Sequence, residues 1–221
     1  MRYLTAAALA LCLGGCSFLD PPKPLATTTA PAPAAPDIEV SGDLLGRLLL
    51  TPADLPAGYA PMPAQASGPG AMTGLGTGVT QCGGASSGTP AATAQTVLAK
   101  GMTGPFVAEV VAAPGDAAAR ELVADVAAAA AACPNFSGDA GGTKVTVSLS
   151  QMTVPRYGDV ASGVQLVATP EGLPLSIHGY VVAFAYRGLA VTVLVMSLQE
   201  IDKAAAGTVV TAAERRARTA K

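Results

Sequence analysis

The sequence predicts an α+β fold, in which about six strands form a single antiparallel sheet and two main helices pack on one face of it. Short runs rich in β-branched residues recur between turn signals in the second half of the chain. Two longer segments carry apolar residues at helical spacing. Strands adjacent in sequence are expected to pair antiparallel. The 221 residues suffice for one domain with appendages.

The predicted strands are 94–100, 106–112, 143–150, 159–168, 176–186 and 189–197. Within 143–150, valine and leucine alternate with polar residues, so one side of that strand should face solvent. The last two strands form a long hairpin that turns at Arg187-Gly188. Because Arg187 interrupts the apolar run of this hairpin and β-branched residues dominate it, the sequence favours a hairpin over a membrane-spanning helix.

Two long helices and a short one complete the predicted domain. The first long helix covers 116–133, and Pro134 ends it. The second covers 199–219 and carries arginines near its carboxyl end, where the helix dipole favours cations. A leucine-rich segment beginning at Asp43 predicts a short helix that ends before Pro52 and docks on the domain.

The amino terminus predicts secretion and lipid attachment. Residues 1–15 contain one cation, a short apolar stretch and two glycines, which is the pattern of a signal peptide. The following motif, Leu13-Gly14-Gly15-Cys16, resembles the lipobox of bacterial lipoproteins, whose cysteine receives a diacylglycerol. Two acyl chains hold a protein stably on a membrane, so we expect Cys16 to anchor the mature chain on the extracytoplasmic face of the cell membrane. The alternative is ordinary secretion with a coincidental cysteine.

Residues 16–42 are rich in Pro, Ala and Thr and predict a disordered stalk. The extracytoplasmic α+β domain follows at 43–221 and includes a long loop at 60–92 that is rich in Gly, Ser and Pro. After cleavage and lipidation two thiols remain, Cys82 and Cys133. In an oxidising compartment they should form a disulfide that pins the long loop to the end of a helix.

Composition and motifs argue against several classes of function. Thirteen basic and fifteen acidic residues leave a charge of −2, which excludes a nucleic-acid partner bound through bulk electrostatics. A lone histidine and two oxidised thiols predict neither a metal site nor a cofactor. The Gly84–Gly88 segment fits G-x-S-x-G around Ser86, but it lacks the preceding strand and the following helix of a nucleophile elbow. We therefore expect a protein that is not an enzyme.

The last hairpin carries the candidate ligand-facing residues. One face of its first strand presents aromatic and ring side chains, namely His178, Tyr180, Phe184 and Tyr186. Both faces of the hairpin are apolar, whereas a sheet covered on one side should have a polar second face. Three covers are open at this point: the leucine-rich segment with the long loop, a bound apolar small molecule, or an envelope protein.

Four segments carry a family resemblance: LLLTPADLPAGY (48–59), ACPNF (132–136), GDVASGVQL (158–166) and YRGLAVTVLV (186–195). Together they resemble secreted lipoproteins of actinobacteria, especially mycobacteria, and more distantly the extracellular sensor domain of a mycobacterial Ser/Thr receptor kinase. The resemblance implies an α+β extracytoplasmic domain and brings no catalytic residue. We expect a ligand-binding or sensor-like module, with an envelope carrier of lipid or glycolipid as the alternative.

Overall fold

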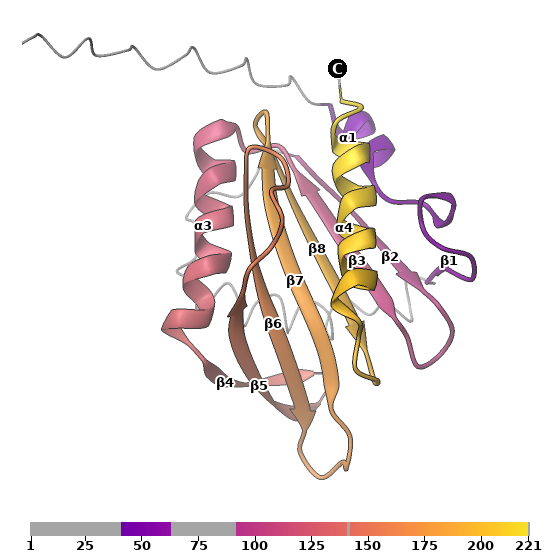
Figure 1. Ribbon diagram of the computed structural model, residues 1–221, viewed down its shortest axis with the longest axis vertical. Coiled ribbons are helices and arrows are strands. Elements are labelled where there is room, and N and C mark those ends of the chain that lie inside the picture. Colours follow the sequence, from indigo (N-terminus) through magenta and orange to yellow (C-terminus); the bar gives the residue numbers. More distant parts are fainter. Residues whose placement is uncertain (1–40, 63–91, 141, 221) are drawn as a thin grey trace, which may run out of the picture. The chain divides into compact units, whose positions relative to one another are not determined.

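A computed structural model describes residues 41–62, 92–140 and 142–220 of the chain (Figure 1). The predicted signal peptide, nearly all of the stalk and most of the long loop lie outside the described residues. All described residues belong to one compact unit. No helix among them combines the length and the apolar composition needed to cross a bilayer.

An eight-stranded antiparallel sheet forms the centre of the described unit, in the order β1-β2-β3-β8-β7-β6-β5-β4. The strands are β1 (Ala60–Pro61), β2 (Thr93–Ala99), β3 (Phe106–Ala112), β4 (Asn135–Ala140), β5 (Thr143–Met152), β6 (Val160–Pro170), β7 (Ile177–Tyr186) and β8 (Leu189–Ser197). The helices are α1 (Gly42–Leu48), the single 3-10 turn η1 (Pro52–Asp54), α3 (Asp116–Ala132) and α4 (Lys203–Ala217).

The predicted α+β class and single antiparallel sheet are confirmed, but the expected number of strands was too low. The two additional strands, β1 and β4, are short edge strands. One is an Ala-Pro pair in the predicted long loop, and the other reads Asn-Phe-Ser-Gly-Asp-Ala. The first is too short to show a pattern and Phe136 is the only large apolar residue of the second, so main-chain hydrogen bonds to a neighbouring strand define them more than side-chain burial does.

The two long helices lie on opposite faces of the sheet, so the prediction that both pack on one face is wrong. Helix α3 packs on the face that presents Ala183 and Ala185 of β7. Helix α4 packs on the face that presents Val182 and Phe184 of the same strand. Successive residues of a strand point to opposite faces. The apolar character of the hairpin on both faces is thereby explained, since each face has its own helix.

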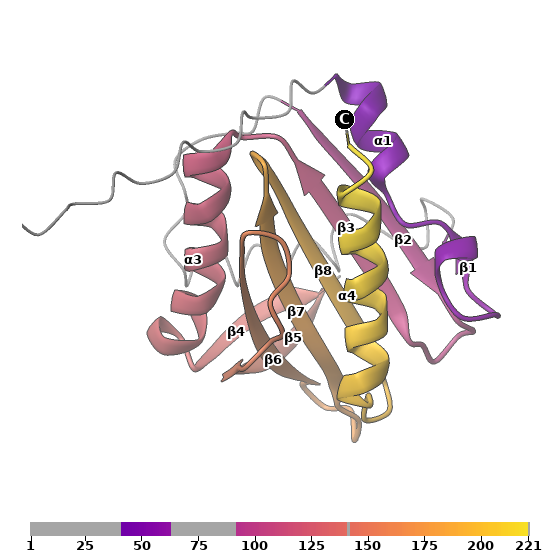
Figure 2. The ribbon, with the colours of Figure 1, turned by 45° about the horizontal axis from the view of Figure 1, so that its top comes forward.

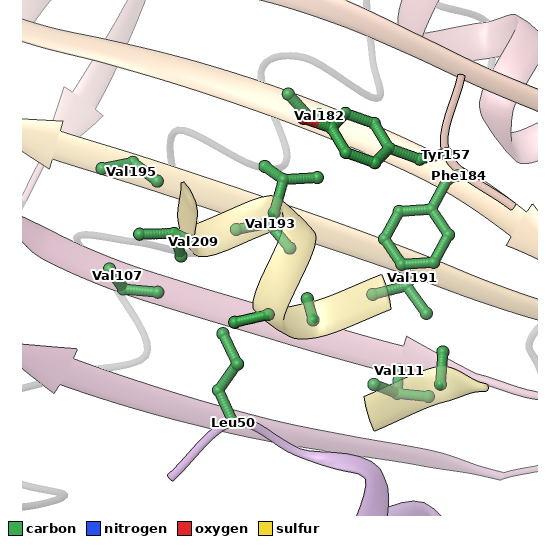
Figure 3. Packing of buried hydrophobic residues seen from close by; sticks show 14 of the residues in the cluster. Leu50, Val107, Val111, Tyr157, Val182, Phe184, Val191, Val193, Val195 and Val209 are labelled. Carbon is green, nitrogen blue, oxygen red and sulfur yellow. The ribbon is translucent and has the colours of Figure 1, made fainter. Parts of the chain in front are cut away.

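The main core lies between α4, α1 and strands β3, β7 and β8 (Figures 2 and 3). Helix α1 ends before Pro52, as predicted, and buries Leu45 and Leu48 in this core. Leu50 follows and belongs to the same cluster as Val107 of β3 and Val209 of α4 (Figure 3). The leucine-rich segment and α4 therefore share the cover of this face. Of the three covers considered from the sequence, the first is correct in part, but α4 was not among them.

Candidate functional site

A groove with apolar walls lies between the first half of α4, the segment 152–157 after β5, and the beginning of β7. Its volume is about 470 Å³, within the range of sites that bind small molecules. The lining residues are Met152, Val154, Pro155, Tyr157, Tyr180, Val182, Asp202, Lys203, Ala204, Ala206, Gly207 and Val210. Among the residues the structure describes, this groove is the strongest candidate for a binding site.

Small residues of α4 leave room for the groove. The helix begins after Asp202, whose carboxylate accepts a hydrogen bond from the amide of Ala204 at 3.2 Å. Side chains at an N-cap commonly accept such bonds. Gly207 lies on the groove side, and a β-carbon built there would meet only the Tyr157 hydroxyl, at 3.7 Å. A larger residue at position 207 would therefore extend into open space.

A close contact with the sheet fixes the opposite wall. The segment 152–157 crosses β6 at Gly163, where a β-carbon would lie 2.5 Å from Cγ1 of Val154 and 3.1 Å from Cγ of Met152. A glycine is thus required for this segment to lie so close to the strand. The Tyr157 ring then packs at a tilt against Phe184, with 6.3 Å between ring centroids.

Tyr180 connects the groove to the start of α4. Its hydroxyl donates a hydrogen bond to the carbonyl of Ile201 at 3.2 Å, which orients the ring as part of the wall. The charged groups at this end of the groove are Asp202, which caps the helix, and Lys203, which forms no ion pair with any described residue. The groove can thus hold an apolar group with a polar or charged end near Lys203.

The structure brings only one of the four predicted ligand-facing residues into the groove. Tyr180 lines it, but Phe184 is fully buried in the core. The Tyr186 ring instead receives the guanidinium of Arg218, 5.0 Å from the ring centroid. His178 is partly buried and pairs in register with Ser197. The small residues of α4 were not predicted to line a site, although Gly207 inside a helical pattern was a usable signal.

The cysteine predictions fall largely outside the described residues. Cys16 and Cys82 are not described, and neither is Ser86. Cys133 is described and caps the carboxyl end of α3, its amide donating to the carbonyl of Ala129 at 2.9 Å. Pairing of Cys82 with Cys133 stays a prediction. The described residues contain no cluster of three or more metal-ligating side chains.

A buried carboxyl on β3 is the second unusual feature. Glu109 is 1 % exposed, and its Oε2 accepts a hydrogen bond from the amide of Leu50 at 2.6 Å. Its Oε1 has no hydrogen-bond partner among the described residues. Burial raises the pKa of Glu109 to about 7, although the Leu50 amide and the charge of Arg216 act to lower it. Its signal in the sequence is one acidic residue inside the apolar strand FVAEVVA, and it was not among the predicted site residues.

The fold and the groove define an α+β domain with a candidate small-molecule site. Comparison of the chain with family models and with curated proteins gave no match.

Proposed function

We propose that the chain is a lipid-anchored extracytoplasmic domain, without enzymatic activity, that binds an apolar or amphipathic small molecule beside Tyr180. The observation that carries the binding role is the apolar groove of about 470 Å³ along α4. Walls of valine, proline, methionine and tyrosine favour an apolar ligand, since burial contributes about 25 cal/mol for each Å² of apolar surface. The anchor at Cys16 rests on the signal peptide and the lipobox motif.

Groove filling tests the binding role. In Gly207→Leu the new side chain should occupy the groove, and the fluorescent probe 8-anilinonaphthalene-1-sulfonate should bind at least about tenfold more weakly, a change of about 1.4 kcal/mol. Thr208→Leu is the matched control, because it adds the same side chain at the next, exposed position of the same helix. Equal affinity of the probe for both variants and the wild type would contradict a binding role for the groove.

The anchor is tested separately in a bacterial host. Labelled palmitate should be incorporated into the wild-type chain and not into Cys16→Ala, and only the wild type should fractionate with membranes. A wild-type chain without label would reject the anchor and would have no bearing on ligand binding in the groove. Ester hydrolysis that disappears in Ser86→Ala would reject the proposal that the protein is not an enzyme.

The alternative is an envelope carrier of lipid or glycolipid, which the groove's apolar walls and volume also favour. A carrier must enclose most of its cargo, and this groove lies beside Tyr180 but not beside the buried Phe184. Native mass spectrometry of the full chain from its host distinguishes the two roles. A co-purifying lipid that Gly207→Leu loses would favour the carrier, whereas an unliganded mass would favour the sensor-like module. The resemblance to mycobacterial lipoproteins is compatible with both.

A further inference from the structure

Residues 41–55, here called the strap, pack on the α4 face of the sheet. They directly follow the predicted stalk and so connect it to the rest of the domain. The strap comprises α1, η1 and the residues between and after them. Its leucines Leu45, Leu48, Leu50 and Leu55 are buried in the main core. Since its backbone forms no ladder with a strand, side-chain burial and a few polar contacts hold it in place.

Arg216 of α4 fixes the strap from one side. Its guanidinium donates to the carbonyl of Arg47 at 2.7 Å and to the carbonyl of Leu49 at 3.1 and 3.2 Å. It also lies 3.7 Å from a carboxylate oxygen of Asp54. Asp54 in turn accepts hydrogen bonds from the amide and hydroxyl of Thr51 at 2.9 and 2.7 Å. These contacts are permanently available over the physiological pH range, because a guanidinium does not deprotonate there.

Glu109 of β3 contacts the strap from the sheet. The Leu50 amide donates to one oxygen of its carboxyl, and the carboxyl is buried on the face of β3 that also presents Val107 and Val111 to the core shared with the strap's leucines. The charged groups acting on it are Arg216 from α4 and Asp54 from η1. In register on either side lie Thr96 of β2 and Val193 of β8, which are uncharged. An ionised carboxylate at this position is desolvated and has one oxygen without a partner among the described residues, which is costly.

We propose that the strap is a pH-sensitive element, docked tightly while the Glu109 carboxyl is neutral and loosened as that carboxyl ionises. Undocking would hydrate the carboxyl and release the segment that connects the domain to its stalk. The proposal does not depend on the groove having a ligand, because it concerns a different set of contacts.

The direction follows from linkage. Docking raises the pKa of Glu109 from its ordinary 4.5 to about 7, through burial, so the docked state binds the proton more tightly. The contribution of Glu109 to docking is therefore complete below pH 4.5 and is lost as the pH rises through about 7. The difference between these two pKa values limits the loss to about 300-fold in the docking equilibrium.

Hydrogen exchange of the full chain between pH 5 and 9 tests the proposal, with Glu109→Gln as the reference at each pH. The variant keeps an acceptor for the Leu50 amide and cannot ionise, so the intrinsic pH dependence of exchange cancels in the ratio. Strap amides should open more in the wild type than in Glu109→Gln as the pH rises, with a midpoint near 7 and at most about 300-fold. Amides of β6 are the control and should show no such midpoint.

Three results would overturn the proposal: identical pH profiles for both proteins, a midpoint shared by strap and β6, or opening at low pH. If Glu109→Gln does not fold, Arg216→Gln provides the second measurement. The guanidinium charge of Arg216 lowers the pKa of Glu109. Its loss should therefore move the midpoint to higher pH, whatever its effect on the amplitude. An unchanged midpoint in Arg216→Gln would also reject the role of Glu109.

Discussion

Gly158→Ala should destabilise the protein far more than a substitution at any open turn glycine. Gly158 joins the groove segment 152–157 to β6 and has φ +53°, a conformation that favours glycine. A β-carbon there would lie 2.2 Å from the carbonyl oxygen of Ala185 in β7. No real β-carbon approaches an oxygen so closely. Because the nearest atoms are the backbone oxygen and carbon of Ala185, the main chain itself would have to move.

The magnitude can be separated into two parts with a control. Gly172 also has positive φ, +78°, but a β-carbon there meets nothing within 4 Å. Gly172→Ala should therefore cost only the left-handed conformation, about 1–2 kcal/mol. Gly158→Ala adds the clash, and relief of it breaks the hydrogen bond from the Asp159 amide to the Ala185 carbonyl, 2.8 Å long. Losing that bond in a partly buried place costs about 1–3 kcal/mol.

We thus expect a destabilisation of about 2–5 kcal/mol for Gly158→Ala against about 1–2 for Gly172→Ala. The measurement is urea unfolding followed by far-ultraviolet circular dichroism, since the chain has no tryptophan. The slope of the unfolding free energy with urea should be the same for both variants. Equal losses, within about 0.5 kcal/mol, would show that the close approach of Gly158 to Ala185 is not what constrains this turn.

Three further predictions concern the groove, the core and the strap. Gly207→Ala should raise the free energy of unfolding by up to about 1 kcal/mol, since alanine suits a helix interior better and its methyl group has room; a lower urea midpoint would contradict this. Phe184→Ala should cost about 3–5 kcal/mol because the ring is fully buried, whereas Leu173→Ala at an exposed turn should change stability by less than about 0.5. Burial acts to raise the pKa of Asp54, but hydrogen bonds from Thr51 and the charges of Arg216 and Arg215 lower it overall. The contribution of Asp54 to stability is therefore present above pH 3.8 and is lost in acid. Asp54→Asn should flatten the acid side of the stability profile, and an unchanged slope there would contradict that assignment.

The local elements could be predicted because their signals are local. Strands β3 and β8 begin and end at the predicted residues, and α3 ends one residue earlier than predicted. Pairing of β3 with β8 was not predicted, because it joins residues such as Phe106 and Met196 that are ninety positions apart. Periodicity cannot show which distant strands become neighbours, and it identifies an apolar face without identifying its cover.

The candidate site was predicted only in part, because most of its residues come together only in the folded chain. Tyr180 was singled out because aromatic side chains on an apolar face are conspicuous in a sequence. The groove depends as much on residues that occupy little space, Gly163 under Val154 and Gly207 opposite Tyr157. A missing side chain becomes informative only when its neighbours in space are known. Glu109 was overlooked for a similar reason, since the amide that donates to its carboxyl belongs to Leu50 of the strap, about sixty residues away in sequence.

Helix α4 carries both proposed features, and their separation along it makes the two proposals independent. Gly207 in its first half lines the groove, whereas Arg216 near its end holds the strap. Nine residues of α-helix separate them by about 13 Å, and no residue of the strap lines the groove. Filling the groove through Gly207→Leu should therefore leave the pH profile of the strap unchanged, and Glu109→Gln should leave probe binding unchanged. A variant that altered both would indicate that α4 itself shifts on the sheet, because both sets of contacts then depend on its position.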